Sequence, residues 1–395
     1  MSTDRVDIFL QDIEVPDIVQ KKARDAFSKI RMESNGEQGK IMKHNKNKKV
    51  YPFGMTRAAA IVAAALIGTG SITAVAAAYM HWSHGMQSKM NVSEEQILEL
   101  QNMEDTPLSF PEISDTQGDI TVSVAQCLLD DNTIRLAFYI DGYELPVNEE
   151  PQLENLNILL DGVPASNFEW SFYTGIDRDE NGNPVMADGS AVKVDADGGF
   201  IPNYRIADGK MELDLTMSPV DEKGKAISNL AGKVITIQME NLGETVGQWT
   251  LEWTLDGTAT VVEKELSEVL GESGATVTKV ALSPISIKVC YDFARQKIME
   301  TAIDEKGNEI EVSNYKEPPQ LIGVKMKDGT VYMGIMDGGA CGYEDTESSV
   351  FVAEVRLSRI LNPKEVQSLL FLRDDSKISA AQEITEEQCY TVELE

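Results

Sequence analysis

The chain has 395 residues and a formal net charge of −30, with 65 Asp and Glu against 35 Lys and Arg. The charge is unevenly divided, because residues 1–57 carry 12 basic and 8 acidic side chains and the remainder has a net charge of −34. So acidic a remainder argues against nucleic acid, anionic lipid and other polyanions as its partners.

Near the N-terminus, 23 consecutive residues from Ala58 to Met80 carry no charge. This length suffices to cross the roughly 30 Å hydrocarbon layer of a bilayer as a helix, so we predict one transmembrane helix over residues 55–80. Basic residues are concentrated before it and only Lys89 follows closely, which places residues 1–54 in the cytoplasm and the C-terminal part outside the cell. The basic residues before it are Lys40, Lys43, Lys46, Lys48, Lys49 and Arg57. Small residues at 74–78 leave the alternative of a long, cleaved signal peptide.

The cytoplasmic tail, residues 1–54, contains a predicted amphipathic helix over residues 16–32. Pro16 suits its first position, and Ser34-Asn35-Gly36 ends it. One half of the helix is apolar and comprises Ile18, Val19, Ala23, Ala26, Phe27 and Ile30. A tail this short cannot bury such a face by itself. We expect the face to dock on a partner protein, and the alternative is that it lies on the lipid headgroups.

The exterior part is predicted to be mainly β. After a stalk over residues 81–116, with a short helix from Glu94 to Met103, short β-like segments separated by turns predict two immunoglobulin-like β-sandwich domains, over residues 117–258 and 259–395. The predicted strands include 120–128, 133–140, 233–239, 276–282 and 285–293. A late helix is expected over residues 362–369, with Pro363 at its first position.

Two Trp residues, Trp249 and Trp253, alternate with Leu251 and Leu255 and therefore share one face of a strand. Exposed, they would form a sugar-binding platform, but core packing is the favoured interpretation.

A calcium site is a second candidate, because the segment from Asp177 to Asp188 approximates a calcium-binding loop. Pro184 interrupts the pattern, and the related segments 221–224 and 304–307 look like hairpin turns without the full acidic set. We therefore favour a hairpin turn at this position.

Enzymatic chemistry finds little support. No histidine follows residue 84, so the exterior part has no imidazole base for a Ser or Cys nucleophile, and we predict neither an enzyme nor a cofactor. The four cysteines, Cys127, Cys290, Cys341 and Cys389, match no metal motif, and they fit either disulfides or buried thiols.

Several segments together resemble a known family. They are Ile13–Pro16, residues 70–74 (Gly-Ser-Ile-Thr-Ala), Thr278–Pro284, Val324–Gly329 and the Asn362-Pro363 pair. The chain resembles anti-sigma-factor-like single-pass membrane proteins of Gram-positive bacteria, which have immunoglobulin-like extracellular domains of unknown function. The resemblance implies that the apolar tail face binds a sigma factor and that the exterior domains sense a ligand. The tail departs from many anti-sigma factors because it lacks a His-Cys zinc domain. The alternative function is a surface-anchored or secreted adhesive protein without a transcriptional role.

Overall fold

The computed structural model describes residues 82–394, apart from 93–95, 98–99, 101–105, 147–148, 179–182, 196–197, 206–208, 223, 258, 260, 304–308, 346 and 374–383. The predicted cytoplasmic helix with its six apolar residues and the predicted transmembrane helix both lie outside the described residues. Within the described part, no helix is long and apolar enough to cross a membrane. The chain divides into two compact units, Met1–Met80 and His81–Glu395, and the second is described here.

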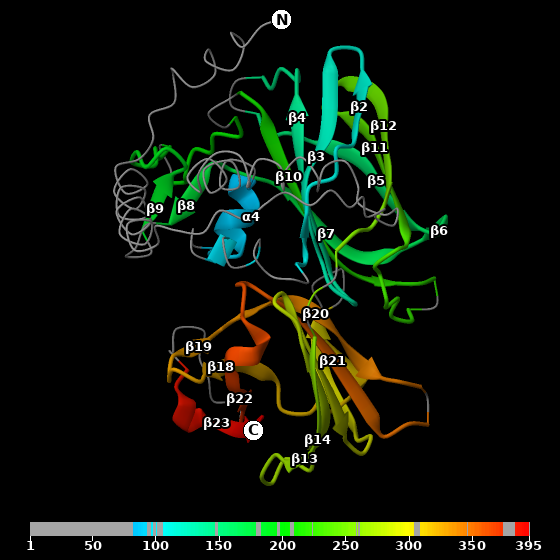
Figure 1. Cartoon of the computed structure of the whole chain (residues 1–395), viewed down its shortest axis with the longest axis vertical. Helices are drawn as coiled ribbons and strands as arrows, with labels where there is room; N and C mark the ends of the chain where they lie inside the picture. Colours follow the sequence, from blue (N-terminus) through cyan, green and yellow to red (C-terminus); the bar gives the residue numbers. More distant parts are fainter. Residues whose placement is uncertain are drawn as a thin grey trace, which may run out of the picture. The chain divides into compact units, whose positions relative to one another are not determined.

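The second unit is mainly β, as predicted, and every strand pairing in its sheets is antiparallel (Figure 1). One sheet, sheet A, has the strand order β1-β3-β4-β10-β7, with β2 also paired to β3. Its strands are β1 (Leu108–Ser109), β2 (Ser114–Gln117), β3 (Ile120–Leu129), β4 (Ile134–Asp141), β7 (Ser166–Phe172) and β10 (Met211–Val220). A second sheet, sheet B, has the order β12-β11-β5-β6, formed by β12 (Thr245–Thr254), β11 (Val234–Leu242), β5 (Leu153–Leu160) and β6 (Val163–Pro164).

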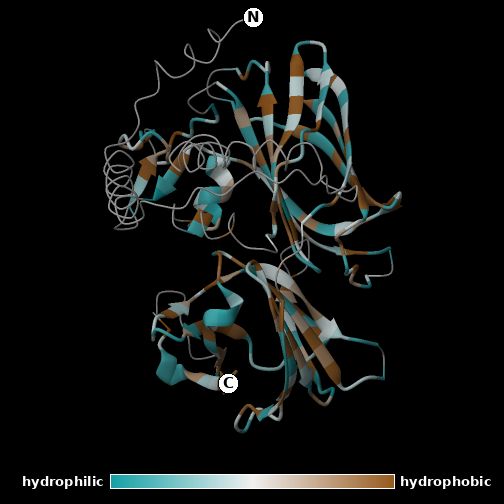
Figure 2. Cartoon of the chain, in the orientation of Figure 1, coloured by the Kyte–Doolittle hydropathy of each residue, from teal (hydrophilic) through white to brown (hydrophobic). Residues whose placement is uncertain are grey.

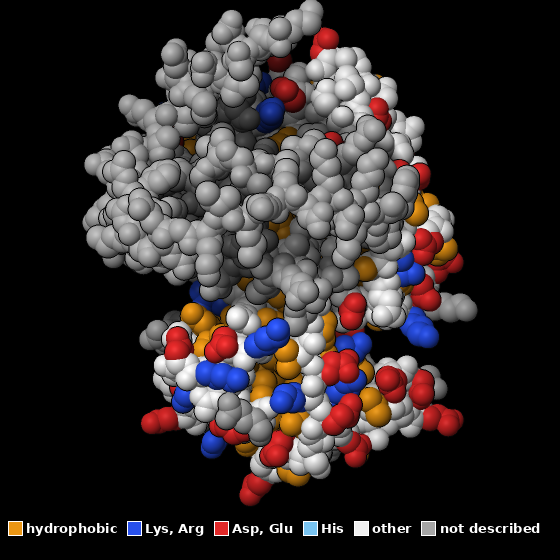
Figure 3. All heavy atoms as spheres, viewed as in Figure 1, with side chains coloured by type: hydrophobic (Ala, Val, Ile, Leu, Met, Phe, Trp, Pro, Cys, Tyr) orange, Lys and Arg blue, Asp and Glu red, His pale blue; other side chains and the backbone are white. Residues whose placement is uncertain are grey.

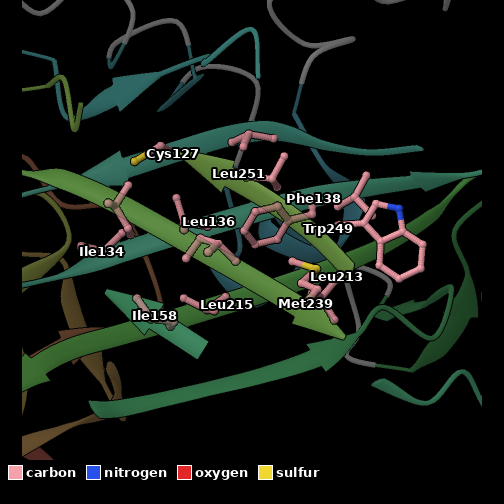
Figure 4. Close-up of a cluster of buried hydrophobic side chains, with 14 of the residues drawn as sticks. Cys127, Ile134, Leu136, Phe138, Ile158, Leu213, Leu215, Met239, Trp249 and Leu251 are labelled. Atoms are coloured by element: carbon pink, nitrogen blue, oxygen red, sulfur yellow. The ribbon is translucent and has the colours of Figure 1, made fainter. Parts of the chain in front are cut away.

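Sheets A and B enclose one hydrophobic core, to which both contribute every second residue of their strands (Figures 2 and 4). Leu136 and Phe138 of β4 and Leu213 of β10 face Trp249 and Leu251 of β12, and all five are fully or almost fully buried. This packing follows from the period-two alternation of the strands, which places apolar side chains on one face only.

The remaining strands form a second pair of sheets around a separate core. Sheet E has the order β13-β14-β15-β21-β20, formed by β13 (Val262–Val269), β14 (Thr276–Leu282), β15 (Ser286–Asp292), β21 (Val350–Leu357) and β20 (Met336–Tyr343). Sheet G has the order β19-β18-β22-β23, formed by β19 (Val331–Met333), β18 (Leu321–Met326), β22 (Val366–Leu372) and β23 (Cys389–Glu393). A separate hairpin, β16 (Lys297–Ile303) and β17 (Glu309–Tyr315), lies between β15 and β18 in sequence.

The two sheet pairs repeat one topology. If β3, β4, β5, β7, β10, β11 and β12 are lettered A to G, the sheets read A-B-E-D and G-F-C. The same lettering of β14, β15, β18, β20, β21, β22 and β23 again produces A-B-E-D and G-F-C. The two halves therefore have the same strand order, and each has its own sequence and its own hydrophobic core.

The structure agrees with most predicted elements and differs at two places. Each of the five predicted strands overlaps an observed one, namely β3, β4, β11, β14 and β15. The first sheet pair begins at Leu108, before residue 117, because β1 and β2 pair with β3. The predicted helix over 362–369 is wrong beyond its first turn. Asn362 caps a single 3-10 turn, Pro363–Glu365, and the chain then enters β22 because its apolar side chains are buried between the sheets.

We expect Trp249→Ala to lower the free energy of unfolding by about 3–5 kcal/mol, because it empties a fully buried site and leaves the Ile120 carbonyl without the indole N–H that now donates to it. Val246→Ala is the matched control, since Val246 lies on the same strand and is 88% exposed; it should change stability by less than about 0.5 kcal/mol. Urea unfolding of the full chain measures both, and equal effects would contradict the assigned core.

Candidate functional site

The most distinctive site in the described part is the outer face of sheet A, which is covered by helix α4 (His84–Lys89). The first four N–H groups of a helix have no partner within the helix. In α4 all four are satisfied, three of them by side chains of sheet A. Ser83 N–H donates to Gln126 Oε1 of β3 at 2.7 Å, and the Ser83 hydroxyl accepts from Met86 N–H at 3.2 Å. We call Gln126, Glu212 and Ser83 the α4 clamp.

Glu212 of β10 is the central member of the clamp. Its carboxylate accepts from the backbone N–H groups of His84 and Gly85, at 3.1 and 2.8 Å. His84 Nδ1 lies 3.0 Å from the same carboxylate, and the imidazole stacks on Tyr173 with 6.2 Å between ring centres. A carboxylate at a helix N-terminus is also favoured by the helix dipole. These contacts compensate for the complete burial of the Glu212 side chain.

Apolar packing holds the same segment. One cluster buries apolar side chains of the α4 region and of the residues that follow it, namely Trp82, Met86, Met90, Val92, Ile97 and Leu100. The other members come from both sheet pairs. Sheet A contributes Leu108, Leu128 and Ala137, and the second sheet pair contributes Ile285 and Ile360. The described residues of the predicted stalk are therefore packed on the β structure, and both sheet pairs contribute to their contacts.

Asp214, two residues after Glu212, is buried on the same face. Neither of its carboxylate oxygens has a hydrogen-bond partner among the described residues. Lys89 Nζ is 3.9 Å from Oδ2 and donates instead to Ser171 Oγ at 2.9 Å. Burial therefore raises the pKa of Asp214 to about 7, although the charges of Lys89 and Arg135 oppose this shift.

A polar cavity of about 290 Å³ lies where the turn between β3 and β4 meets the outer face of sheet E. It is lined by Asp131 and Asn132 of that turn and by Lys279 and Lys288 of sheet E, among others. The buried Asp130 carboxylate holds the two sides together, since it accepts from the hydroxyls of Ser283 and Ser286 and from the Asn132 and Thr133 N–H groups. Burial raises the pKa of Asp130 despite these four bonds. The mixed charges of the lining suit a small polar ligand.

Two arginines complete the contacts between the sheet pairs. Arg135 of β4 donates to Asp337 Oδ2 at 2.8 Å and to the Leu357 carbonyl at 2.7 Å. In return, Arg356 of β21 donates to Glu169 Oε1 at 2.6 Å and to the Asp337 carbonyl at 2.9 Å. Planar guanidinium groups suit such multiple contacts. Over the visible face of the second sheet pair, charges of both signs are interspersed (Figure 3).

The site residues considered in the sequence have different outcomes. The six apolar residues of the tail lie outside the described residues. Trp249 and Trp253 are buried, so they belong to the core and form no sugar platform.

In the calcium-loop candidate, the chain forms the favoured hairpin, with strands β8 (Ile176–Arg178) and β9 (Pro184–Met186). Asp177 accepts from the Tyr173 hydroxyl at 2.7 Å, and Asp188 accepts from Ser190 N–H at 2.9 Å. Positions 179–182, which include two of the candidate ligands, lie outside the described residues.

All four cysteines are free thiols. Cys127 is fully buried, and burial raises its pKa to about 12, so it is a core residue.

Sequence reasoning did not single out Gln126, Glu212, Asp214, Asp130 or Arg135. The segment Met211–Ser218 alternates apolar and polar residues, which is typical of a strand with one solvated face. A local pattern carries no signal that a distant helix covers this polar face.

Comparison with known proteins adds little. No family model and no curated protein matches the chain. The crystal structure of a conserved domain protein from Bacillus anthracis is similar over 67% of this chain and 76% of its own, with 13% identity and a TM-score of 0.32. A similarity this weak carries no argument about fold or function.

We expect Glu212→Gln to lower the free energy of unfolding by about 1–3 kcal/mol, because an amide NH2 would face one of the donors that the carboxylate now accepts from. Amide exchange at residues 84–90 should accelerate most. Glu252→Gln is the matched control, since within the described ranges Glu252 accepts only from the Thr236 hydroxyl of the neighbouring strand. Exchange that accelerates equally throughout sheet A would contradict a local clamp.

We expect Asp337→Asn to cost more stability than Glu169→Gln. Arg135 is almost fully buried and would lose the acceptor of its buried N–H group, at a cost of about 1–3 kcal/mol. Arg356 is also buried, but Glu169 is 58% exposed and Arg356 keeps its bond to the Asp337 carbonyl, so water can take the place of the Glu169 carboxylate at a cost below about 1 kcal/mol. Thermal unfolding of both variants decides the order, and a larger loss in Glu169→Gln would refute it.

Proposed function

We propose that the protein is a non-enzymatic, single-pass membrane regulator of the anti-sigma-factor-like type. In this proposal the cytoplasmic tail binds a sigma factor through Ile18, Val19, Ala23, Ala26, Phe27 and Ile30, and the exterior β domains act as the sensor. The apolar face of the predicted tail helix and the basic residues before the predicted span support this proposal.

We further propose that the two sheet pairs are immunoglobulin-like sandwiches. The repeated strand orders A-B-E-D and G-F-C support this proposal, because they match the constant-type immunoglobulin arrangement. Many cell-surface domains share this architecture, which fits a sensor.

The observation that carries the proposal is the α4 clamp. Helix α4 begins at His84, four residues after the predicted span ends at Met80. A chain that only tethered the exterior domains would need no contacts here. Instead, the first turn of α4 is bonded to sheet A through Gln126 and Glu212, and its apolar side is buried with residues of both sheet pairs. A change in the β domains can therefore reach the segment that leaves the predicted span.

The polar cavity beside Asp130 is the place where we expect a ligand to act. A ligand there would contact the turn of the first sheet pair and sheet E of the second. It would therefore favour one relative arrangement of the two sheet pairs over another. Because residues of both pairs contact the α4 region, such a change would also affect α4. A sensor needs such a difference, because a ligand shifts the equilibrium between two states only if it binds one of them more tightly than the other.

We expect Ile30→Glu to reduce capture of a sigma factor by at least tenfold, because it places a charge at the centre of the predicted apolar face. Ser28→Glu is the matched control, since it adds the same charge to the opposite side of the helix and should leave capture unchanged. The measurement is co-purification of each of the cell's sigma factors with the full-length, detergent-solubilised chain. Capture of none of them by the native chain would favour the surface-adhesive alternative.

A further inference from the structure

We propose that Asp214 is a proton-binding site that controls the docking of α4 on sheet A. Helix α4 is docked when Asp214 is neutral, and its docking is weakened when Asp214 is ionised. As a regulatory device the inference rests on the proposed function of the chain as a membrane regulator. The proton-dependent docking itself does not depend on that function.

The geometry distinguishes Asp214 from its neighbour on the same strand. Glu212 accepts two backbone N–H groups and faces the His84 imidazole, so its charge is compensated. Asp214 is equally covered by α4 but accepts no hydrogen bond among the described residues. The cover is tight at Gly85, where an added Cβ would overlap Asp214 Oδ2. Beside it, an opening of only about 10 Å³ is lined by Asp214, Met86 and Lys89, among others. An ionised carboxylate in such a place loses its hydration and receives no donor in return.

The charged groups around Asp214 come from every element that packs against it. Helix α4 contributes Lys89, β10 contributes Glu212, β4 contributes Arg135, and Tyr173 follows β7. One contact further away, His84 of α4 lies against Glu212, and Asp177 of β8 accepts from the Tyr173 hydroxyl. The two cations only partly compensate for burial, because Arg135 is bonded to Asp337 and the Leu357 carbonyl, and Lys89 donates to Ser171. Glu212 opposes ionisation of Asp214.

Release of α4 would return Asp214 to water, where a carboxylate ionises readily. The pKa of Asp214 is about 7 in the docked form against an ordinary value of 3.8, so the docked form binds more protons between these two values. Docking is therefore strongest near pH 4 and weakens as the pH rises. The loss is about tenfold per pH unit, reaches about a thousandfold near pH 7, and then levels off.

The test is hydrogen–deuterium exchange of the α4 amides in the full chain in lipid nanodiscs, from pH 4 to pH 9. Protection is expressed relative to the intrinsic exchange rate at each pH, which removes the chemical pH dependence. We expect protection of residues 84–89 to fall between pH 4 and pH 7 in the native chain. In Asp214→Asn, which keeps the shape and removes the titration, protection should be independent of pH.

Three further variants make the test specific. Asp141→Asn changes an exposed aspartate at the end of β4 and should keep the native profile. His84→Gln removes the imidazole that contacts Glu212, so it should lower protection at every pH and still keep the decline between pH 4 and pH 7. Lys89→Met leaves Asp214 in place and removes a cation that lowers its pKa, so the end of the decline should move to higher pH.

The inference is overturned if native protection does not change with pH, if Asp214→Asn keeps the native profile, or if His84→Gln or Asp141→Asn flattens it. An unmoved profile in Lys89→Met also overturns it. Sigma-factor capture is measured separately, so its failure would refute the proposed function and leave the proton site standing.

Discussion

The structure depends on how the polar outer face of sheet A is covered. All but the last residue of β10 are buried, which means that both faces of this strand have lost contact with water. A buried polar group must find a partner or remain neutral. Glu212 accepts from two backbone N–H groups of α4 and contacts the His84 imidazole. Arg135 donates to Asp337 and to a carbonyl, and Asp214 makes no hydrogen bond within the described part of the chain. These three outcomes on one face explain why a helix of only six residues can be held so specifically.

Short helices are unstable alone, because a single turn or two cannot repay the entropy of forming them. Helix α4 is stable here since its first-turn donors and its apolar side chains are both engaged by the β structure. The same cluster includes Ile285 and Ile360 of the second sheet pair. The helix region and the two sheet pairs therefore stabilise one another through these contacts. This sharing is the physical basis of the proposed transmission from the exterior domains to the predicted span.

Because the two sheet pairs have the same strand order, each position in one pair has an equivalent in the other, and different residues occupy these equivalent positions. In the first pair, Asp130 lies in the turn before the second strand of the A-B-E-D sheet. In the second pair, Ser283 lies in the corresponding turn and Ser286 begins the strand, and the hydroxyls of both donate to Asp130. Likewise, Arg135 lies on strand B of the first pair and Arg356 on strand E of the second, and each donates to a carboxylate of the other pair. Unlike side chains at related positions therefore make the interface specific, and the cavity beside Asp130 lies within that interface.

The sequence by itself determined the mainly β architecture, because alternation and turn residues act within a few positions of the chain. It also determined that Trp249, Leu251, Trp253 and Leu255 share a buried face. A local signal was also correct for a helical turn that begins at Pro363, but the strand that follows depends on pairing with β18 and β23. Only the tertiary structure decided that the polar residues of β10 are buried, since their cover lies more than 120 residues away in sequence. Such contacts leave no trace in local periodicity, and so the clamp and Asp214 could not be found from the sequence.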